Sequence, residues 1–223
     1  MAANRKFVFT NDGIYHVFNR GIERRNVFST ISDYRRFFQL LSYCRNDGLS
    51  CRFSHIPREM KKGHTCPRTT KEVQPCLVEI LAWCLLPNHY HLVLRQKRFN
   101  GITKYMARVS NSYTRYYNTR NKRIGNLFQG PFKAVIVETD DQLIHLSRYI
   151  HLNPVVASLI PINKLATYHW SSYLEYLDLI QGFTEKQSVL GYFPSEFAYR
   201  VFVNNQDEFA AEVEKVRHLT LEA

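Results

Sequence analysis

The sequence has no apolar run near the roughly 20 residues that a membrane-spanning helix needs, so we do not expect a membrane protein. Its first segment, MAANRKFVFTNDG, lacks the long apolar stretch of a secretory signal, and we expect a cytoplasmic location. The five cysteines include no pair at C-x-x-C spacing, which favours free thiols over a disulfide framework. A zinc site at His64, Cys66 and Cys76, in a polar loop, is a minor alternative.

Acidic residues are absent between Glu79 and Glu138, whereas ten basic residues fall in that window. The net charge of +11 is therefore uneven: residues 1–136 hold 24 Lys and Arg against 7 Asp and Glu, and residues 137–223 hold 6 against 12. A patch of one sign binds a polyanion because it releases counterions from the phosphates. The first two thirds are thus predicted to face nucleic acid, although a generally basic protein is the alternative.

Hydrophobic patterning predicts the element order β-α-β-β-α-β-α. The expected strands are 13–19, 77–86, 90–94 and 134–137, and the expected helices are 33–44, 99–120 and 140–151. This order predicts an α+β fold, a ferredoxin-like antiparallel sheet with helices on one face, plus a C-terminal helical extension. We expect a catalytic domain at 1–160, with an insertion at about 48–76, and the extension at 161–223.

Two histidines, His89 and His91, open a predicted strand in the segment LPNHYHLVL. Alternate residues of a strand point to one face, so the two imidazoles project side by side and could share a divalent metal. For a bare His-x-His, a packed and hydrogen-bonded pair is the alternative. Their place after a turn, beside the most basic part of the chain, favours the metal site.

The third predicted helix places His145, Tyr149 and Asn153 four residues apart, and therefore on one face. A tyrosine hydroxyl with its ordinary pKa of about 10 is a poor nucleophile at neutral pH unless a metal or a base assists it. With an oxygen ligand one turn later, a metal beside Tyr149 could supply that assistance. A packed tyrosine is the alternative, and it is the one expected for Tyr113, Tyr116 and Tyr117.

Four blocks resemble the REP-associated tyrosine transposases, which are HUH single-strand transposases with one catalytic tyrosine. In order along residues 11–175 they are LPNHYHLVL, SYTRYYNTRNKRIGNLFQGPFKA, RYIHLNPVVA and YHWSSY. The resemblance implies that His89, His91 and Asn153 ligate a divalent metal, Mg²⁺ or Mn²⁺, and that Tyr149 is the nucleophile. It implies a metal-dependent enzyme that cuts single-stranded DNA beside a hairpin, leaving a 5′-phosphotyrosine link and a free 3′-OH.

Basic residues of the acid-free window are expected to hold the DNA backbone, with a solvated helix face as the alternative for some of them. They are Lys104, Arg108, Arg115, Arg120, Lys122, Arg123 and Lys133. A competing function from another class is a domesticated, non-catalytic protein that binds DNA or RNA hairpins. A phosphodiesterase of small molecules is disfavoured by the basic window, and a monomer and a dimer are both compatible with the sequence.

Overall fold

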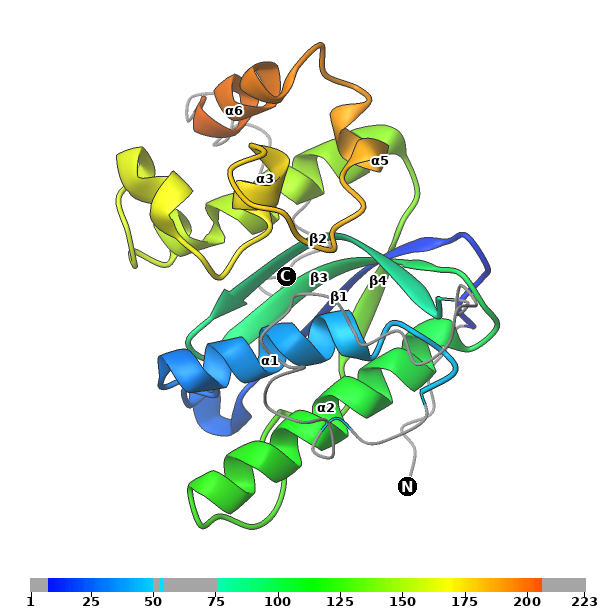
Figure 1. Cartoon of the computed structure of the whole chain (residues 1–223), viewed down its shortest axis with the longest axis vertical. Helices are drawn as coiled ribbons and strands as arrows, with labels where there is room; N and C mark the ends of the chain where they lie inside the picture. Colours follow the sequence, from blue (N-terminus) through cyan, green and yellow to red (C-terminus); the bar gives the residue numbers. More distant parts are fainter. Residues whose placement is uncertain (1–7, 50–52, 54–75, 206–223) are drawn as a thin grey trace.

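The computed structural model describes residues 8–49, 53 and 76–205 of the chain (Figure 1). The predicted order of strands and helices is observed: β1 (Ile14–Arg20), α1 (Ile31–Tyr43), β2 (Val78–Leu86), β3 (His89–Gln96), α2 (Gly101–Arg120), β4 (Lys133–Val137) and α3 (Asp140–Val156). Four short elements follow: η3 (Ile162–Thr167), α4 (Tyr173–Tyr176), α5 (Gln187–Leu190) and α6 (Glu196–Asn204). Nearly all of the predicted 48–76 insertion lies outside the described residues.

The four strands form one antiparallel sheet in the spatial order β2-β3-β1-β4. With α1 between β1 and β2, and α2 between β3 and β4, this is the ferredoxin-like arrangement. The predicted fold class, an α+β protein with such a sheet and with C-terminal helices, is confirmed. The central pair is β1 and β3, so residues of these two strands have neighbours on both sides.

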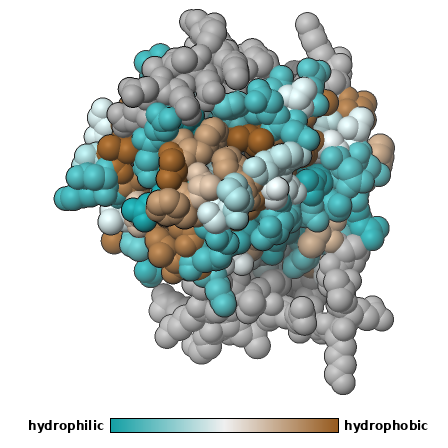
Figure 2. Space-filling view, turned by 90° about the horizontal axis from the view of Figure 1, so that it is seen from above, coloured by the Kyte–Doolittle hydropathy of each residue, from teal (hydrophilic) through white to brown (hydrophobic). Residues whose placement is uncertain are grey.

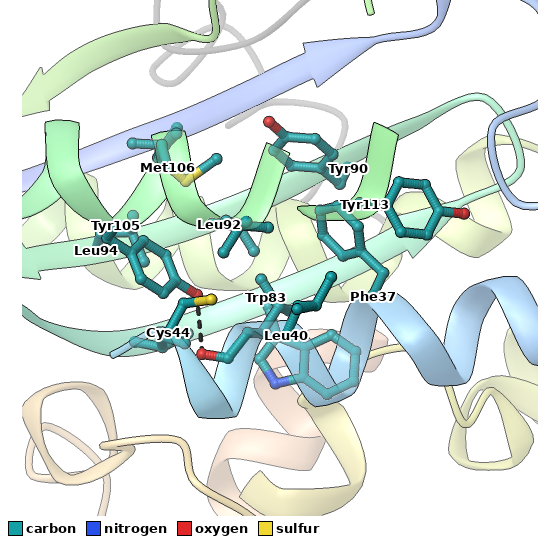
Figure 3. Close-up of a cluster of buried hydrophobic side chains, with 14 of the residues drawn as sticks. Phe37, Leu40, Cys44, Trp83, Tyr90, Leu92, Leu94, Tyr105, Met106 and Tyr113 are labelled. Carbon is teal, nitrogen blue, oxygen red and sulfur yellow. Dashed lines mark hydrogen bonds between the residues drawn. The ribbon is translucent and has the colours of Figure 1, made fainter. Parts of the chain in front are cut away.

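Helices α1 and α2 cover one face of the sheet, the lower one in Figure 1. Their apolar side chains form a buried cluster with the strands, and Figure 3 shows Phe37 and Leu40 of α1 beside Met106 and Tyr113 of α2 and Leu92 of β3. Burying one such side chain stabilises the fold by about 1.5–3 kcal/mol relative to leaving it exposed. This cluster therefore holds both helices on the sheet.

The tyrosines of α2 have structural partners, as expected. The hydroxyl of Tyr113 donates to the carbonyl of Val27 at 2.5 Å, and that of Tyr117 donates to the carbonyl of Asn26 at 3.1 Å. Tyr116 donates to the carboxylate of Asp33 at 3.2 Å. Tyr113 and Tyr117 thus fix α2 against the segment before α1, and Tyr116 fixes it against the first turn of α1.

Helix α3 packs on the opposite face of the sheet, together with the C-terminal helices (Figure 1). The expectation that the helices lie on one face holds for α1 and α2 and does not hold for α3. The cause is visible in the strands: Ile80 and Leu94 belong to the core under α1 and α2, whereas Leu81 and Val93 belong to the core under α3. A continuous apolar run such as residues 80–86, without alternation, is typical of a strand buried on both faces.

Two helix ends differ from the sequence prediction. Thr30 caps α1 and forms a reciprocal capping box with Asp33, so the helix begins two residues early. Helix α3 continues through Pro154 to Val156. Proline removes one backbone hydrogen bond, but this loss falls in the last turn, where the N–H of Ala157 still donates to the carbonyl of Asn153 at 2.8 Å.

The residues after 160 pack into the same core as α3. Ser171 forms a β-bridge with Cys84 of the edge strand β2. The indole N–H of Trp83 donates to a carboxylate oxygen of Glu175 at 3.2 Å. These contacts join the C-terminal segment to the sheet, and the domain division at residue 160 stays a prediction.

The face seen from above carries apolar side chains between hydrophilic ones (Figure 2). Helices α5 and α6 lie on this side of the molecule in Figure 1, and Phe197 and Val201 of α6 are 70% and 52% exposed. In the described part of the chain, no helix is both long and apolar enough to cross a membrane.

The buried imidazole of His151 connects α3 to the C-terminal segment. Its Nδ1 lies 2.7 Å from the hydroxyl of Tyr199, and its Nε2 lies 2.8 Å from the hydroxyl of Ser172. Both ring nitrogens are engaged, and burial lowers the pKa of His151 to about 3.

We expect the protein to lose stability as the pH falls below 6.5, because the unfolded chain then binds a proton that the buried His151 does not. Between pH 6.5 and pH 5, one such group lowers the free energy of unfolding by about 2 kcal/mol. Urea unfolding at several pH values measures this, and His151→Gln should remove this share of the pH dependence. His169→Gln, at an exposed position, is the control; an unchanged pH dependence in His151→Gln would contradict the prediction.

Candidate active site

The two histidines of the His-x-His segment lie side by side at the start of β3. A two-residue turn, Pro87-Asn88, joins β2 to β3 and pairs Leu86 with His89. The ring centroids of His89 and His91 are 4.9 Å apart, with the rings at 83° to each other. The predicted projection of both imidazoles to one face of the sheet is confirmed.

Each of these imidazoles uses its Nδ1 in a hydrogen bond. The Nδ1 of His89 donates to the side-chain oxygen of Asn88 at 2.5 Å, and the Nδ1 of His91 lies 2.9 Å from the Nε2 of His16. The Nε2 of His91 is buried and has no hydrogen-bond partner among the described residues. An imidazole presents to a metal the nitrogen that carries no proton. The Nε2 of His89 is therefore open to a metal, and so is that of His91 in the tautomer whose Nδ1 donates to His16.

Both histidines are neutral at physiological pH. Burial, and then the charge of Arg20, lower the pKa of His89 to about 4. Burial lowers the pKa of His91 well below its ordinary value, with further contributions from His16, His89 and Arg20. A neutral imidazole has a lone pair to offer, so neither ring needs to lose a proton before it can ligate a metal.

Helix α3 brings Tyr149 to this histidine pair from a distant part of the chain. The ring centroids of Tyr149 and His91 are 5.8 Å apart, with the rings at 89°, and Tyr149 is 3% exposed. One turn later, the side-chain amide of Asn153 donates to the carbonyl of Tyr149 at 2.8 Å. The amide oxygen of Asn153 cannot donate a hydrogen bond, and it is the atom of this side chain that could bind a metal.

His145 does not join the site, although it was expected on the same helical face. Its Nε2 lies 3.2 Å from the carboxylate of Asp141, and its ring centroid lies 5.6 Å from that of Phe202 in α6. Residues four apart are offset by about 40° around the helix axis, and this offset also separates Tyr149 from Asn153, so the difference lies in the contacts. The ring of Tyr149 meets His91 of the sheet, whereas that of His145 meets Asp141 and Phe202.

Sequence reasoning missed His16, the buried residue of β1 that bonds to His91. Its signal was present in the predicted strand 13–19, where His16 alternates with the apolar residues Tyr15 and Val17. The alternation shows that His16 points away from those two side chains. Only the register between β1 and β3 shows that it meets His91, and a sequence does not contain that register.

The predicted DNA-binding residues separate into two groups. Lys133 begins β4 and pairs with Phe18, which pairs with His91, so this exposed lysine lies on the face that carries the histidines. The α2 residues Lys104, Arg108, Arg115 and Arg120 lie on the helix that covers the other face, and Lys122 and Arg123 follow it.

Two of the α2 cations have partners within the protein. Arg108 donates to the carbonyl of Asn46 at 2.8 Å and lies 3.5 Å from a carboxylate oxygen of Asp47. Arg120 donates to the buried carboxylate of Asp33 at 2.8 Å. Lys104 and Arg115 are exposed, which leaves them accessible to a phosphate.

The three predicted ligands are of residue types that suit a divalent cation. His89 and His91 offer imidazole nitrogens and Asn153 an amide oxygen, which are ligands that Mn²⁺ and Mg²⁺ accept. Among the described residues, no three His, Cys, Asp or Glu side chains gather into a metal site. Neutral imidazoles and an amide carry no charge, so these three ligands would contribute no negative charge to the site. The alternative zinc site lies outside the described residues at His64 and Cys66.

Comparison with known proteins gives one family match. Residues 61–153 match the family model described as "Transposase IS200 like". A comparison with the curated proteins finds no match.

Two solved structures are similar to this chain. The first is described as the REP-associated tyrosine transposase bound to a REP hairpin; it is 14% identical, with a TM-score of 0.53 over 80% of this chain and 86% of that one. At this low identity, the structural match shows a shared fold alone. The second, described as a candidate transposase of Deinococcus radiodurans, is 14% identical over 67% of this chain and 95% of that one, with a TM-score of 0.32. The resemblance read from the sequence is thus confirmed: residues 61–153, which contain His89, His91, Tyr149 and Asn153, carry the pattern of the IS200-like transposases.

Proposed function

We propose that this chain is a transposase that nicks and rejoins single-stranded DNA at hairpin-associated sites, with Tyr149 as the nucleophile. The observation that carries the proposal is the contact between the ring of Tyr149 and His91, whose buried Nε2 has no partner among the described residues. A site for hydrolysis by water needs no tyrosine at this place. A site that stores the cut strand on the protein does need one.

The proposed reaction exchanges one phosphodiester for another. The hydroxyl oxygen of Tyr149 attacks the phosphorus, the bond from phosphorus to the 3′ oxygen breaks, and the hydroxyl proton is transferred to that leaving oxygen. The products are a 5′-phosphotyrosine and a free 3′-OH, and attack by a 3′-OH on the phosphotyrosine reverses the step and joins the strands. His89, His91 and Asn153 would hold the metal. When bound, a Mg²⁺ or Mn²⁺ ion polarises a non-bridging phosphate oxygen and offsets the charge of the transition state.

The DNA substrate is proposed from the charge distribution and from the similar structure. The basic two thirds of the chain suit a phosphate backbone, and the exposed Lys133 lies on the face of the histidines. The similar transposase is described with a REP hairpin, and we propose a hairpin-bearing single strand for this chain also. Because Tyr149 is 3% exposed, binding of DNA must turn this side chain or shift α3 before attack.

Tyr149→Phe should abolish formation of a covalent protein–DNA adduct while leaving the fold intact, because it removes only the attacking oxygen. We expect a loss of at least about a thousandfold in the rate of adduct formation. The measurement uses labelled single-stranded hairpin DNA with Mn²⁺ and denaturing gel electrophoresis. Tyr116→Phe, which also loses one hydroxyl, is the matched control; an adduct in Tyr149→Phe at the wild-type rate would exclude Tyr149 as the nucleophile. It would also exclude a non-catalytic function for this chain.

His16→Leu should weaken Mn²⁺ binding by about 10–100-fold, because the Nδ1 of His91 loses the partner that fixes its tautomer and its ring orientation. His16→Gln, whose amide oxygen can accept from His91, should restore part of the affinity. Calorimetric or EPR titration with Mn²⁺ measures both. His145→Gln controls for the loss of an imidazole elsewhere, and wild-type affinity in His16→Leu would show that His16 does not position His91.

Lys133→Ala should reduce DNA affinity more than Lys104→Ala, because Lys133 shares the face of the histidines and Lys104 lies on the helix across the sheet. Loss of one phosphate contact lowers the salt dependence of binding by about one unit of slope. Fluorescence anisotropy at several salt concentrations measures this slope. Equal losses in the two variants would indicate that the DNA also follows the α2 face.

A further inference from the structure

Arg20 ends β1 directly opposite His89 in the register of the central strands. Its side chain is half-buried, and its Nε is buried without a hydrogen-bond partner among the described residues. Neither the sequence patterns nor the family resemblance singled it out. A guanidinium group beside a prospective metal site, with an unsatisfied buried N–H, requires a physical explanation.

The backbone around Arg20 is held tightly against the histidine turn. The N–H of Gly21 donates to the carbonyl of Asn88 at 2.8 Å, and the N–H of Gln129 donates to the carbonyl of Arg20 at 2.8 Å. A Cβ atom on Gly21 would lie 2.3 Å from the carbonyl oxygen of Arg25, so only glycine permits this close return of the chain. The position of Arg20 beside His89 is therefore fixed by the fold.

Arg20 differs from the arginines that have carboxylate partners. Arg95 pairs with Glu79 at 2.9 Å, and Arg120 pairs with Asp33 at 2.8 Å. Within the described ranges, no ion pair joins Arg20 to a carboxylate. A partly buried charge without a counterion is costly, and a ligand anion would remove that cost.

The charge of Arg20 also acts on the metal site. It contributes to the lowered pKa of both His89 and His91, so the guanidinium is near enough to disfavour positive charge on either ring. The same repulsion acts on a cation held by these rings, and the donor set of two imidazoles and one amide supplies no negative charge to oppose it. A phosphate between the cation and the guanidinium would attract both of them, so that Arg20 would then favour binding of the cation.

We propose that Arg20 binds the phosphodiester at the site and makes metal binding depend on DNA binding. The proposal rests on the proposed function, because the anion is the scissile phosphate. The planar guanidinium donates to non-bridging oxygens with a geometry that matches a phosphate. Without DNA, Arg20 opposes the ion; with DNA, the phosphate bridges the two positive groups. By linkage, DNA then raises the affinity for the metal by the factor with which the metal raises the affinity for DNA.

Substitution of Arg20 should change the two metal affinities in opposite directions. The experiment titrates Mn²⁺, followed by EPR, into the full chain with and without a hairpin-forming single-stranded oligonucleotide. All variants carry Tyr149→Phe, so the DNA stays uncut. Arg20→Gln should bind free Mn²⁺ at least about threefold more tightly, since a repulsion is removed. The enhancement of Mn²⁺ affinity by DNA, on the order of tenfold with Arg20 present, should fall towards one.

Two further variants separate charge from geometry. Arg20→Lys keeps the charge without the planar donor pair, and should retain the weak binding of free Mn²⁺ while losing part of the enhancement by DNA. Arg24→Gln removes an exposed positive charge four residues away. It should leave the affinity for free Mn²⁺ and its enhancement by DNA as they are in the Tyr149→Phe protein.

The outcomes decide the proposal independently of the function. If Arg20→Gln does not raise the affinity for free Mn²⁺, or keeps the full enhancement by DNA, Arg20 does not couple the two ligands, even in a protein that cuts DNA. If the coupling changes as expected but Tyr149→Phe forms the adduct as the wild type does, the nucleophile is wrong and the role of Arg20 holds. If Arg20→Gln weakens Mn²⁺ binding equally with and without DNA, the role of Arg20 is merely structural, and the proposal is overturned.

Discussion

The register between the two central strands is the constraint on which the rest of the site depends. It sets Arg20 opposite His89 and Phe18 opposite His91, and it brings the ring of His16 within hydrogen-bond distance of His91. A slip of one residue would turn every side chain of β1 to the other face. The apolar residues Tyr15 and Val17, buried under α1 and α2, oppose such a slip. The hydrophobic core on one face of the sheet thereby fixes the polar chemistry on the other.

The position of Tyr149 depends on a second set of contacts, between α3 and the C-terminal segment. His151, two residues after Tyr149, bonds to Tyr199 of α6 and to Ser172, whose hydroxyl also accepts from the backbone N–H of Trp83 in β2. Buried polar groups hold one geometry only when all of them have partners. The described C-terminal residues, 161–205, thus support α3 against the sheet. This agrees with the charge of this part of the sequence, because residues 137–223 hold 12 Asp and Glu against 6 Lys and Arg.

Local patterns predicted the elements, the histidine pair and the helix of Tyr149, because strand and helix periods determine which neighbours share a face. They did not predict which elements meet. His16 and Arg20 were missed because their roles arise from pairing with a strand about 70 residues away. Arg108 and Arg120 were expected to hold DNA, but they have internal partners in Asp47 and Asp33, far from them in sequence. Charge counted along a chain does not show which cations are already paired in the fold.

The electrostatics of the site follow from these placements. Burial keeps both imidazoles neutral, the third predicted ligand is an amide, and the positive charge of Arg20 acts on both imidazoles. A metal site rich in carboxylates attracts its ion in the absence of substrate, whereas the proposed ligand set would expose the ion to repulsion from a guanidinium. The negative charge that a stable arrangement requires must then arrive with the ligand, and a DNA phosphate carries it. For the proposed nuclease site, we therefore expect firm metal binding only when a DNA strand is bound.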